Sequence, residues 1–346
     1  MWPRDGALTA HALDLAGYFD LTRSFYTFCR DVLTKEGYLL HKYNPDKTLA
    51  SRWHPWARNG QKDLPIQEDE TALVLWALWA HFQKWKDIEF IKLLYRSLII
   101  RAADFLASYR DPDTGLPQDS YDLWEERRGV HAFTAATVWA GLIAASKFAR
   151  AFGETKTATH YEAIAARMRQ QVEAVLYRRE LNRFARMVAR GSNGEWQVDE
   201  TVDASLFGLW YFGMFSPDDP RIVATMEAAR TRLWVSTAVG GMARYHNDAY
   251  HQQSQDLATV PGNPWFICTL WVAQWIIARA RNRAELQPAV DVLIWCARHG
   301  LPSGVLAEQV HPHTHAPLSV SPLTWSHASF VTAVQEYLVK WRAVSF

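Results

Sequence analysis

The chain has 346 residues, of which 49% are hydrophobic, so it can bury a large core in one domain or two. Its 37 basic and 36 acidic residues give a net charge of +1, which argues against nucleic acid or an anionic membrane as the main partner. No run approaches the length of a bilayer span, and the start is no signal peptide. We therefore expect a cytoplasmic protein, with export of a longer precursor left open.

Apolar residues recur with a period near 3.6 along most of the chain, which predicts an all-α protein. The helices are expected at roughly 5–18, 21–36, 68–84, 87–108, 131–152, 154–175, 200–213, 218–233, 265–283, 286–299 and 325–343. Only the stretch around 181–198 resembles strands, because Asn193-Gly194 offers a hairpin turn between two short apolar runs.

The predicted connections alternate between tight turns and long loops. The long loops are expected at about 37–67, 109–130, 176–199, 234–264 and 300–324. This alternation is typical of helical hairpins, and closing such hairpins into a ring gathers the long loops at one end. No short repeat is visible, which disfavours an open solenoid. The sequence therefore predicts an α/α barrel, with an inner and an outer ring of helices, in a single domain over residues 1–346.

Six hairpins require twelve helices, whereas the pattern supplies eleven. Since the first two predicted helices already form a tight pair, the missing helix would precede Trp2 or follow Phe346. Its absence would expose apolar flanks, so we expect reduced stability or self-association over that surface.

Two acidic clusters in separate long loops carry the strongest functional signal, one around Asp122-Leu123-Trp124-Glu125-Glu126 and one around Ala307-Glu308-Gln309. Hydrolysis of a glycosidic bond with inversion requires an acid and a base roughly 6.5–9.5 Å apart. Burial against an indole, such as that of Trp124, can keep the acid protonated. We predict Glu125 and Glu308 as this pair, against the alternative that both are solvated loop acids.

Other side chains could hold a ligand. Arg4 and Asp5 begin the first helix, where they could bind hydroxyl groups or simply form a helix-start ion pair. Arg244 lies in a glycine-bearing loop, where an arginine usually faces solvent. Tryptophan is abundant, at 17 residues. Those expected at the loop end are Trp53, Trp56, Trp124, Trp265 and Trp325, and those expected in the core are Trp76, Trp79, Trp271, Trp275 and Trp295.

The sequence gives little support for a metal or a cofactor. Three alternating histidines, His311, His313 and His315, lack a partnered cysteine or carboxylate pattern. No phosphate loop or dinucleotide fingerprint is present. The three cysteines, Cys29, Cys268 and Cys296, have no metal-like spacing and are expected as buried thiols, which suits a reducing compartment.

Five separated blocks in one order resemble the glucoamylase family, family 15 of the glycoside hydrolases, in its prokaryotic branch. The blocks are Trp2-Pro3-Arg4-Asp5, Leu64-Pro65-Ile66-Gln67-Glu68-Asp69-Glu70, Asp122-Leu123-Trp124-Glu125-Glu126, Arg244-Tyr245 with Gly262-Asn263-Pro264-Trp265, and Ala307-Glu308-Gln309 with Leu323-Thr324-Trp325. They span nearly the whole chain. The resemblance implies an (α/α)6 barrel, in agreement with the alternation of the loops.

The resemblance also implies residue roles. Glu125 resembles the general acid and Glu308 the general base. The implied substrate-binding residues are Trp2, Arg4 and Asp5 at the start, Trp124 and Glu126 beside the acid, Arg244, and Trp325. Among them the two arginines and Asp5 resemble the groups that grip the terminal glucose, Glu126 resembles a contact to the leaving sugar, and Trp124 and Trp325 resemble pocket walls.

The implied activity is the exo-acting, inverting release of glucose from non-reducing ends of α-glucans, without a cofactor. Trehalase and glucodextranase activities occur on the same scaffold and stay open. A non-catalytic glucan-binding or regulatory module is the alternative, although a binder would need neither Glu125 nor Glu308. Relatives carry a helix, an aromatic-bearing loop and commonly a β-sandwich domain before the first block. We expect these to be absent from a chain truncated at its N-terminus.

Overall fold

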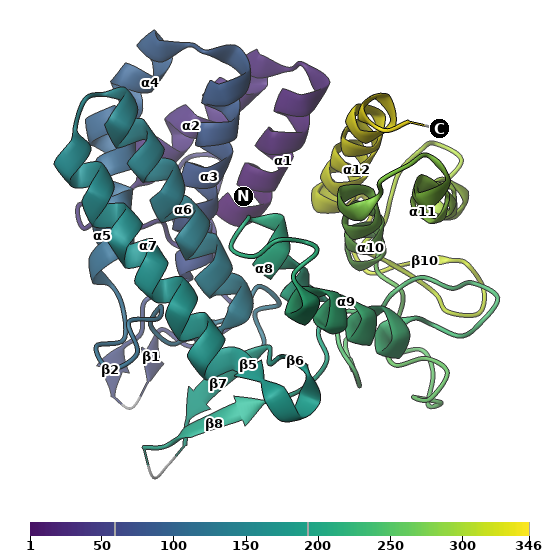
Figure 1. The fold of residues 1–346 in the computed structure, drawn as a ribbon. Helices are drawn as coiled ribbons and strands as arrows, with labels where there is room; N and C mark the ends of the chain where they lie inside the picture. The colour runs from purple at the N-terminus through teal and green to yellow at the C-terminus, as the bar shows by residue number, and fades with distance from the viewer. Residues whose placement is uncertain (59, 192–193, 346) are drawn as a thin grey trace. The chain divides into compact units, whose positions relative to one another are not determined.

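The computed structural model describes residues 1–58, 60–191 and 194–345, which form two compact units. The first unit comprises Met1–Tyr177, Met187–Asp199 and Phe212–Met214. The second comprises Arg178–Arg186, Glu200–Tyr211 and Phe215–Phe346. Figure 1 shows both, coloured from purple at the N-terminus to yellow at the C-terminus. A single catalytic domain over residues 1–346 stays a prediction.

The first unit is built mainly from helices. They are α1 (Pro3–Ala16), α2 (Phe19–Val32), α3 (Glu68–Trp85), α4 (Ile88–Leu94), α5 (Arg101–Ser108), α6 (Ala132–Ala151) and α7 (Thr155–Leu176). A proline at the first position starts α1, and Gly17 in the left-handed conformation ends it. α3 packs closely on α6, where a Cβ added to Gly141 would lie 3.0 Å from the carbonyl oxygen of Ala72. The close approach of these two core helices therefore favours a glycine at this position.

A small antiparallel sheet in the first unit orders the loop that follows α5. Its strands lie in the order β3 (Ser120–Tyr121), β4 (Arg128–His131), β7 (Met187–Arg190) and β8 (Trp196–Asp199). A separate hairpin pairs β1 (Ala57–Arg58) with β2 (Gln61–Lys62). The predicted hairpin in 181–198 is confirmed as β7 and β8, with Val188 opposite Val198. Asn193 of its predicted turn lies outside the described residues.

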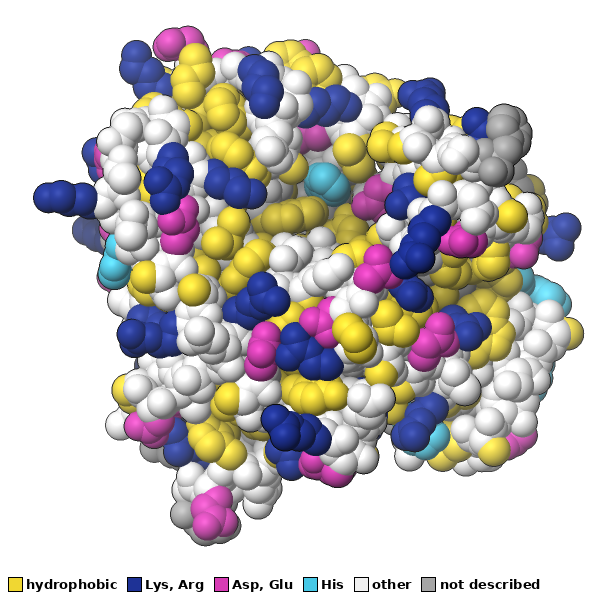
Figure 2. All heavy atoms as spheres, viewed as in Figure 1, with side chains coloured by type: hydrophobic (Ala, Val, Ile, Leu, Met, Phe, Trp, Pro, Cys, Tyr) yellow, Lys and Arg dark blue, Asp and Glu magenta, His cyan; other side chains and the backbone are white. Residues whose placement is uncertain are grey.

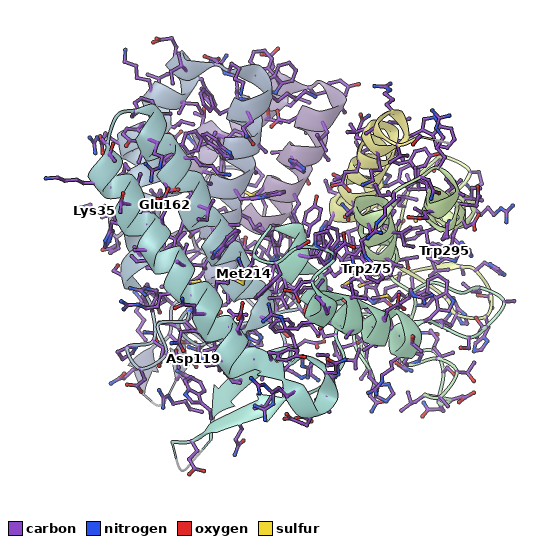
Figure 3. The ribbon with its side chains drawn as sticks, in the orientation of Figure 1. Lys35, Asp119, Glu162, Met214, Trp275 and Trp295 are labelled. Atoms are coloured by element: carbon purple, nitrogen blue, oxygen red, sulfur yellow. The ribbon has the colours of Figure 1, made fainter. Side chains whose placement is uncertain are left out.

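The second unit contains the C-terminal helices. They are the short α8 (Gly208–Tyr211), then α9 (Pro220–Leu233), α10 (Phe266–Arg279), α11 (Gln287–His299) and α12 (Thr324–Ala343). β6 (Arg183–Phe184) precedes them, β9 (Gln309–Val310) pairs with β10 (Pro317–Leu318), and β5 (Tyr177–Arg178) lies at the boundary of the units. Apolar side chains fill the space between α10, α11 and α12. Trp295 of α11, labelled in Figure 3, donates its indole N–H to the carbonyl oxygen of Val239 at 2.7 Å.

The eleven predicted helical segments and the long loops between them are confirmed, with two differences. The segment predicted at 87–108 is interrupted by a π-helical stretch, Tyr95–Ile100, between α4 and α5. The helix predicted at 200–213 is shorter in the structure, where a 3-10 turn, Ala204–Phe207, is followed by α8. The strand prediction was too narrow, because β1 to β5, β9 and β10 were missed. Most of these strands have two residues and cannot show a period of two.

One helix contradicts the prediction that no run has the length of a membrane span. α6 is long and apolar enough to cross a bilayer, with a mean hydropathy of 1.3 over its 18-residue window. However, 83% of that window is buried against the rest of the protein, which is the pattern of a core helix. Figure 2 shows basic and acidic side chains interspersed over one face of the molecule, in keeping with the balanced charge.

The three cysteines are buried and free, as predicted. Burial raises the pKa of the Cys29 and Cys268 thiols well above the ordinary value, so neither thiol is activated for chemistry. The predicted core tryptophans Trp271 and Trp275 are each only 2% exposed.

Candidate active site

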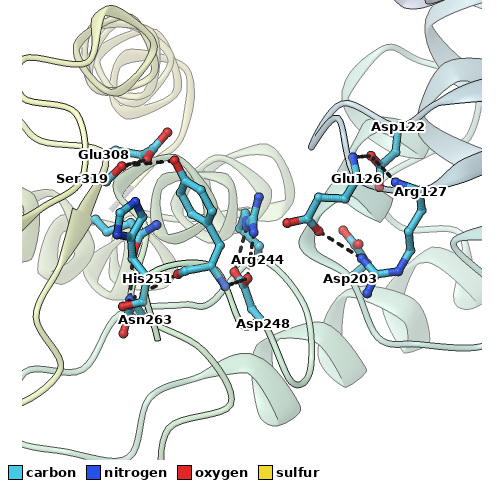
Figure 4. Close-up of polar contacts among 12 residues, drawn as sticks. Asp122, Glu126, Arg127, Asp203, Arg244, Asp248, His251, Asn263, Glu308 and Ser319 are labelled. Carbon is cyan, nitrogen blue, oxygen red and sulfur yellow. Dashed lines mark hydrogen bonds and ion pairs between the residues drawn. The ribbon is translucent and has the colours of Figure 1, made fainter. Parts of the chain in front are cut away.

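The β3–β4 hairpin of the first unit presents Glu125 at its turn. One carboxylate oxygen of Asp122 accepts the backbone N–H groups of Glu126 at 2.8 Å and Arg127 at 3.2 Å. The backbone N–H of Asp122 donates to the carbonyl oxygen of Arg127 at 2.9 Å. Figure 4 shows how these contacts close the turn. Asp122 therefore stabilises the turn of the acidic block. Its contacts do not involve the side chain of Glu125.

Glu125 itself has a strained backbone and a directed side chain. Its φ of 57° lies in the left-handed region, which is costly for a residue with a Cβ and is common at functional sites. Oε1 accepts the indole N–H of Trp2 at 2.7 Å and lies 3.9 Å from Nη2 of Arg4. Among the described residues no hydrogen bond to Oε2 is found, and the side chain is 10% exposed. One carboxylate oxygen is thus fixed, and the other can meet a ligand.

Arg4 is a buried cation at the centre of this cluster. Its side chain is 2% exposed, and Nη1 donates to Oε1 of Gln67 at 3.0 Å and to Oδ2 of Asp69 at 2.8 Å. Glu70 accepts the backbone N–H of Arg4 and lies 3.4 Å from Nη1. Burial raises the pKa of Glu70 well above its usual range, and Arg4 opposes this effect. Each of these groups holds Arg4 in place.

Asp5 shares the environment of Arg4 but keeps access to solvent. Burial raises the pKa of Asp5 to about 6, with Arg4 opposing the shift and Glu125 adding to it. Its side chain is 25% exposed and lies 3.8 Å from Nε of Arg4. The predicted helix-start ion pair is therefore present. The partly exposed carboxyl group remains able to bind a hydroxyl group.

The neighbours of Glu125 in sequence differ in exposure. Trp124 is 8% exposed, whereas Glu126 is more open and its carboxylate accepts a hydrogen bond from Nη1 of Arg127 at 3.0 Å. A small recess beside Glu125 is bordered by Trp53 and His54. The ring of His54 stacks on Tyr121 with centroids 3.5 Å apart, and its Nε2 lies 2.6 Å from the carbonyl oxygen of Glu125.

In the second unit, Glu308 lies just before β9. One of its carboxylate oxygens accepts the hydroxyl of Ser319, and the phenol oxygen of Tyr250 lies 3.4 Å from that hydroxyl (Figure 4). Burial raises the pKa of Glu308, while the Ser319 hydrogen bond and the positive charge of Arg244 act in the opposite direction. Glu308 is thus a partly buried carboxylate with one directed hydrogen bond, as Glu125 is in the first unit.

Arg244 is the buried cation of the second unit. Its Nε and Nη2 donate to the two carboxylate oxygens of Asp248, both at 2.7 Å. The side chains are 3% and 0% exposed, so the solvent-facing interpretation of Arg244 is wrong. The guanidinium also lies 4.7 Å from the ring centroid of Trp265 and 4.9 Å from that of Tyr250. The pairing fixes the plane of the guanidinium beside these rings.

Further polar contacts support the loop that carries Glu308. The amide nitrogen of Asn263 donates to Oε1 of Gln309 at 2.8 Å and to the carbonyl oxygen of His251 at 2.8 Å. Trp325 is buried in the first turn of α12 and packs against Trp271, with centroids 6.0 Å apart. Trp325 therefore packs in the core and also lies near the loop that carries Glu308.

Several residues of these clusters were not singled out by the sequence patterns. Asp69 and Glu70 belong to a noted block but were given no role, although three acids in a row at a helix start were a signal. Asp248 follows Arg244 by four residues, and that spacing indicates a pair only if the loop turns back. Ser319 carries no sequence signal at all, since a serine in a loop is ordinary.

The three alternating histidines form local contacts. Nδ1 of His311 accepts the backbone N–H groups of His313 and Thr314, at 3.1 and 3.3 Å. His315 stacks on His299 instead. Within the part of the chain that the structure describes, no group of three or more His, Cys, Asp or Glu residues could hold a metal ion.

Each unit thus holds a carboxylate close to a buried arginine on a helical scaffold, which is typical of a glycoside hydrolase. The sequence profile of glycosyl hydrolases family 15 matches residues 1–293, and the chain belongs to this family. An uncharacterized glycosyl hydrolase of Methanocaldococcus jannaschii is 29% identical, over 97% of this chain and 50% of that protein. A glucoamylase of a Clostridium species is 28% identical, over 96% of this chain and 46% of that protein. The chain thus spans about half the length of these relatives.

Solved structures show the same fold. A bacterial glucoamylase in complex with acarbose matches 98% of this chain and 49% of its own, with a TM-score of 0.77 and 22% identity. Family 15 glucoamylases have an (α/α)6 barrel, so the predicted fold class is confirmed.

Proposed function

We propose that this chain carries the catalytic machinery of an exo-acting, inverting glycosidase that releases glucose from non-reducing ends of α-glucans. One observation carries the proposal. The two acidic loops each present a carboxylate that forms one directed hydrogen bond, and a buried arginine lies near each carboxylate. In the first unit these are Glu125, Trp2 and Arg4, and in the second they are Glu308, Ser319 and Arg244.

In this mechanism Glu125 is the general acid. Trp2 occupies Oε1, so the proton is carried by Oε2 and passes to the glycosidic oxygen as its bond to the anomeric carbon breaks. Glu308 is the general base and takes a proton from the water that attacks the anomeric carbon from the opposite face. The product is β-glucose. This chemistry requires carboxyl groups roughly 6.5–9.5 Å apart, so that the water fits between Glu308 and the sugar.

Binding of the terminal glucose is assigned to groups around the two carboxylates. Arg4 and Arg244 would donate to its hydroxyl groups, Asp5 would accept from them, and Glu126 would contact the leaving sugar. Because Asp69 and Asp248 already hold the arginines, little side-chain entropy is lost on binding. Trp2, Trp124 and Trp325 would support the walls of the pocket.

The proposed stereochemistry is tested by anomer-resolved NMR during hydrolysis of maltose. We expect β-glucose to appear first and α-glucose to follow only by mutarotation. Early α-glucose would overturn inversion. Parallel assays with isomaltose, trehalose and starch identify the substrate among the activities known on this scaffold. Binding of maltooligosaccharides without glucose release at high protein concentration would instead favour the non-catalytic module.

The variant Ser319→Ala should move the acidic limb of the pH profile to higher pH. The base must be ionised to work, and the hydroxyl of Ser319 lowers the pKa of Glu308 by bonding to its carboxylate. Loss of the hydrogen bond from Ser319 raises the pKa of Glu308. As the pH is lowered, Glu308 of the variant is therefore protonated, and activity lost, at a higher pH than in the unmodified protein. Profiles of kcat/KM for both proteins check the direction of the shift. An unchanged acidic limb would contradict the role of Glu308 as base.

A further inference from the structure

A second hollow of the first unit contains none of the proposed catalytic residues. It is a cleft of about 540 Å³ between the end of α5, the loop after α2 and the β1–β2 hairpin. Leu64, Ile66 and Arg128 border both this cleft and the recess beside Glu125. Its volume lies within the range of roughly 300–1,000 Å³ that is usual for ligand pockets.

Three aromatic rings form one side of the cleft. Phe105 lies between Tyr38 and Tyr109, with ring centroids 5.1 and 4.8 Å away. Phe105 is 7% exposed, whereas Tyr109 is 37% exposed. Among the described residues, neither tyrosine hydroxyl forms a hydrogen bond to a protein group. The cleft therefore presents aromatic surface together with hydroxyl groups that are available to a ligand.

The backbone that carries the two tyrosines is fixed by contacts within the protein. Gly37, at a φ of +98°, passes so close to α5 that an added Cβ would lie 2.2 Å from the carbonyl oxygen of Arg101. Thr34 accepts the backbone N–H of Tyr38 at 3.1 Å and donates to its carbonyl oxygen at 3.0 Å. The backbone N–H of Tyr109 donates to the carbonyl oxygen of Phe105 at 2.8 Å. Such preorganisation lowers the entropic cost of binding.

The charges of the cleft indicate a neutral, polar ligand. Arg128 is paired with Asp119 at 2.8 Å and with Asp63 at 3.3 Å, and Asp119 is labelled in Figure 3. Glu36 and Lys62 lie on the exposed rim, and within the described residues neither forms an ion pair. Three acidic and two basic residues line the cleft, which disfavours an anion, and the polar rim disfavours a purely apolar ligand. Aromatic rings flanked by hydrogen-bonding groups are suited to a saccharide.

We propose that this cleft is a second saccharide site, which holds a segment of glucan chain apart from the catalytic residues. The choice of a glucan rests on the proposed function. A polysaccharide held here would raise the local concentration of chain ends near Glu125, because the two hollows share a wall. The cleft would then improve turnover of long glucans without affecting maltose.

Titration with β-cyclodextrin tests this site directly, since a ring of glucose units has no non-reducing end. We expect saturable binding to the unmodified protein in calorimetry. Tyr109→Ala should weaken this binding roughly tenfold, because it removes one aromatic contact. The exposed change Lys62→Ala should weaken it about two- to threefold without any risk to the fold. Tyr18→Ala is the matched control, because Tyr18 is an exposed tyrosine outside the cleft.

The outcomes separate this site from the proposed function. Absence of cyclodextrin binding, or equal affinity in the Tyr109, Lys62 and control variants, would overturn the second site. Loss of binding only in the cleft variants, with unchanged kcat/KM on maltose, would support it. If cyclodextrin binds in this pattern while no substrate is cleaved, the site stands and the hydrolase proposal fails.

Discussion

The variants Glu125→Gln and Glu308→Gln should each lower kcat on maltose by at least about 10³-fold, while the protein stays folded. Glutamine keeps the size of the side chain and its hydrogen-bonding oxygen, so Trp2 and Ser319 retain partners. It cannot donate an acidic proton or accept one from water. Steady-state kinetics and circular dichroism of both variants check the expectation. Glu89→Gln is the control, since Glu89 is an exposed glutamate of the first unit, outside the proposed site.

Substrates with different leaving groups distinguish the two roles. Fluoride leaves α-glucosyl fluoride without a full proton transfer, so this substrate has little need of a general acid. Glu125→Gln should therefore recover much of its activity on the fluoride, whereas Glu308→Gln should stay inactive on both substrates. Equal recovery by both variants would reverse or remove the assignment.

The helices could be predicted because their apolar periodicity is long and regular. α6 and α7, for example, fall within one residue of the predicted bounds at each end. Glu125 and Glu308 could be singled out because each lies in a short acidic block inside a long loop. Contacts made across long sequence distances could not be predicted in this way. Trp2 reaches Glu125 across 123 residues, and Arg4 reaches Asp69 across 65.

Local backbone geometry was equally hidden from the sequence. The pattern of apolar residues says nothing of the left-handed backbone at Glu125, which depends on the contacts of Asp122 and His54. The π-helical stretch Tyr95–Ile100 also keeps the apolar periodicity of its neighbours and so resembles ordinary helix. Both features depend on packing against other segments, whereas sequence patterns report mainly on local periodicity.

The variants Arg244→Met and Asp248→Asn should each lower the free energy of unfolding by about 3–5 kcal/mol. The two side chains are nearly fully buried and share two hydrogen bonds of 2.7 Å, so each single change leaves a polar or charged group without its partner. The double variant removes both charges and should cost less than the sum of the single changes. Urea denaturation of all four proteins gives the coupling energy of this pair directly.

The exposed pair of Arg279 and Asp218 provides the control in the same unit. Nε of Arg279 lies 2.9 Å from Oδ1 of Asp218, but the side chains are 34% and 49% exposed. The same four-protein cycle on this pair should give at most about 1 kcal/mol, because solvent screens both charges. A comparable coupling for the two pairs would show that burial does not govern the Arg244 interaction. In that case Arg244 could not be regarded as a guanidinium fixed in advance to bind sugar hydroxyl groups.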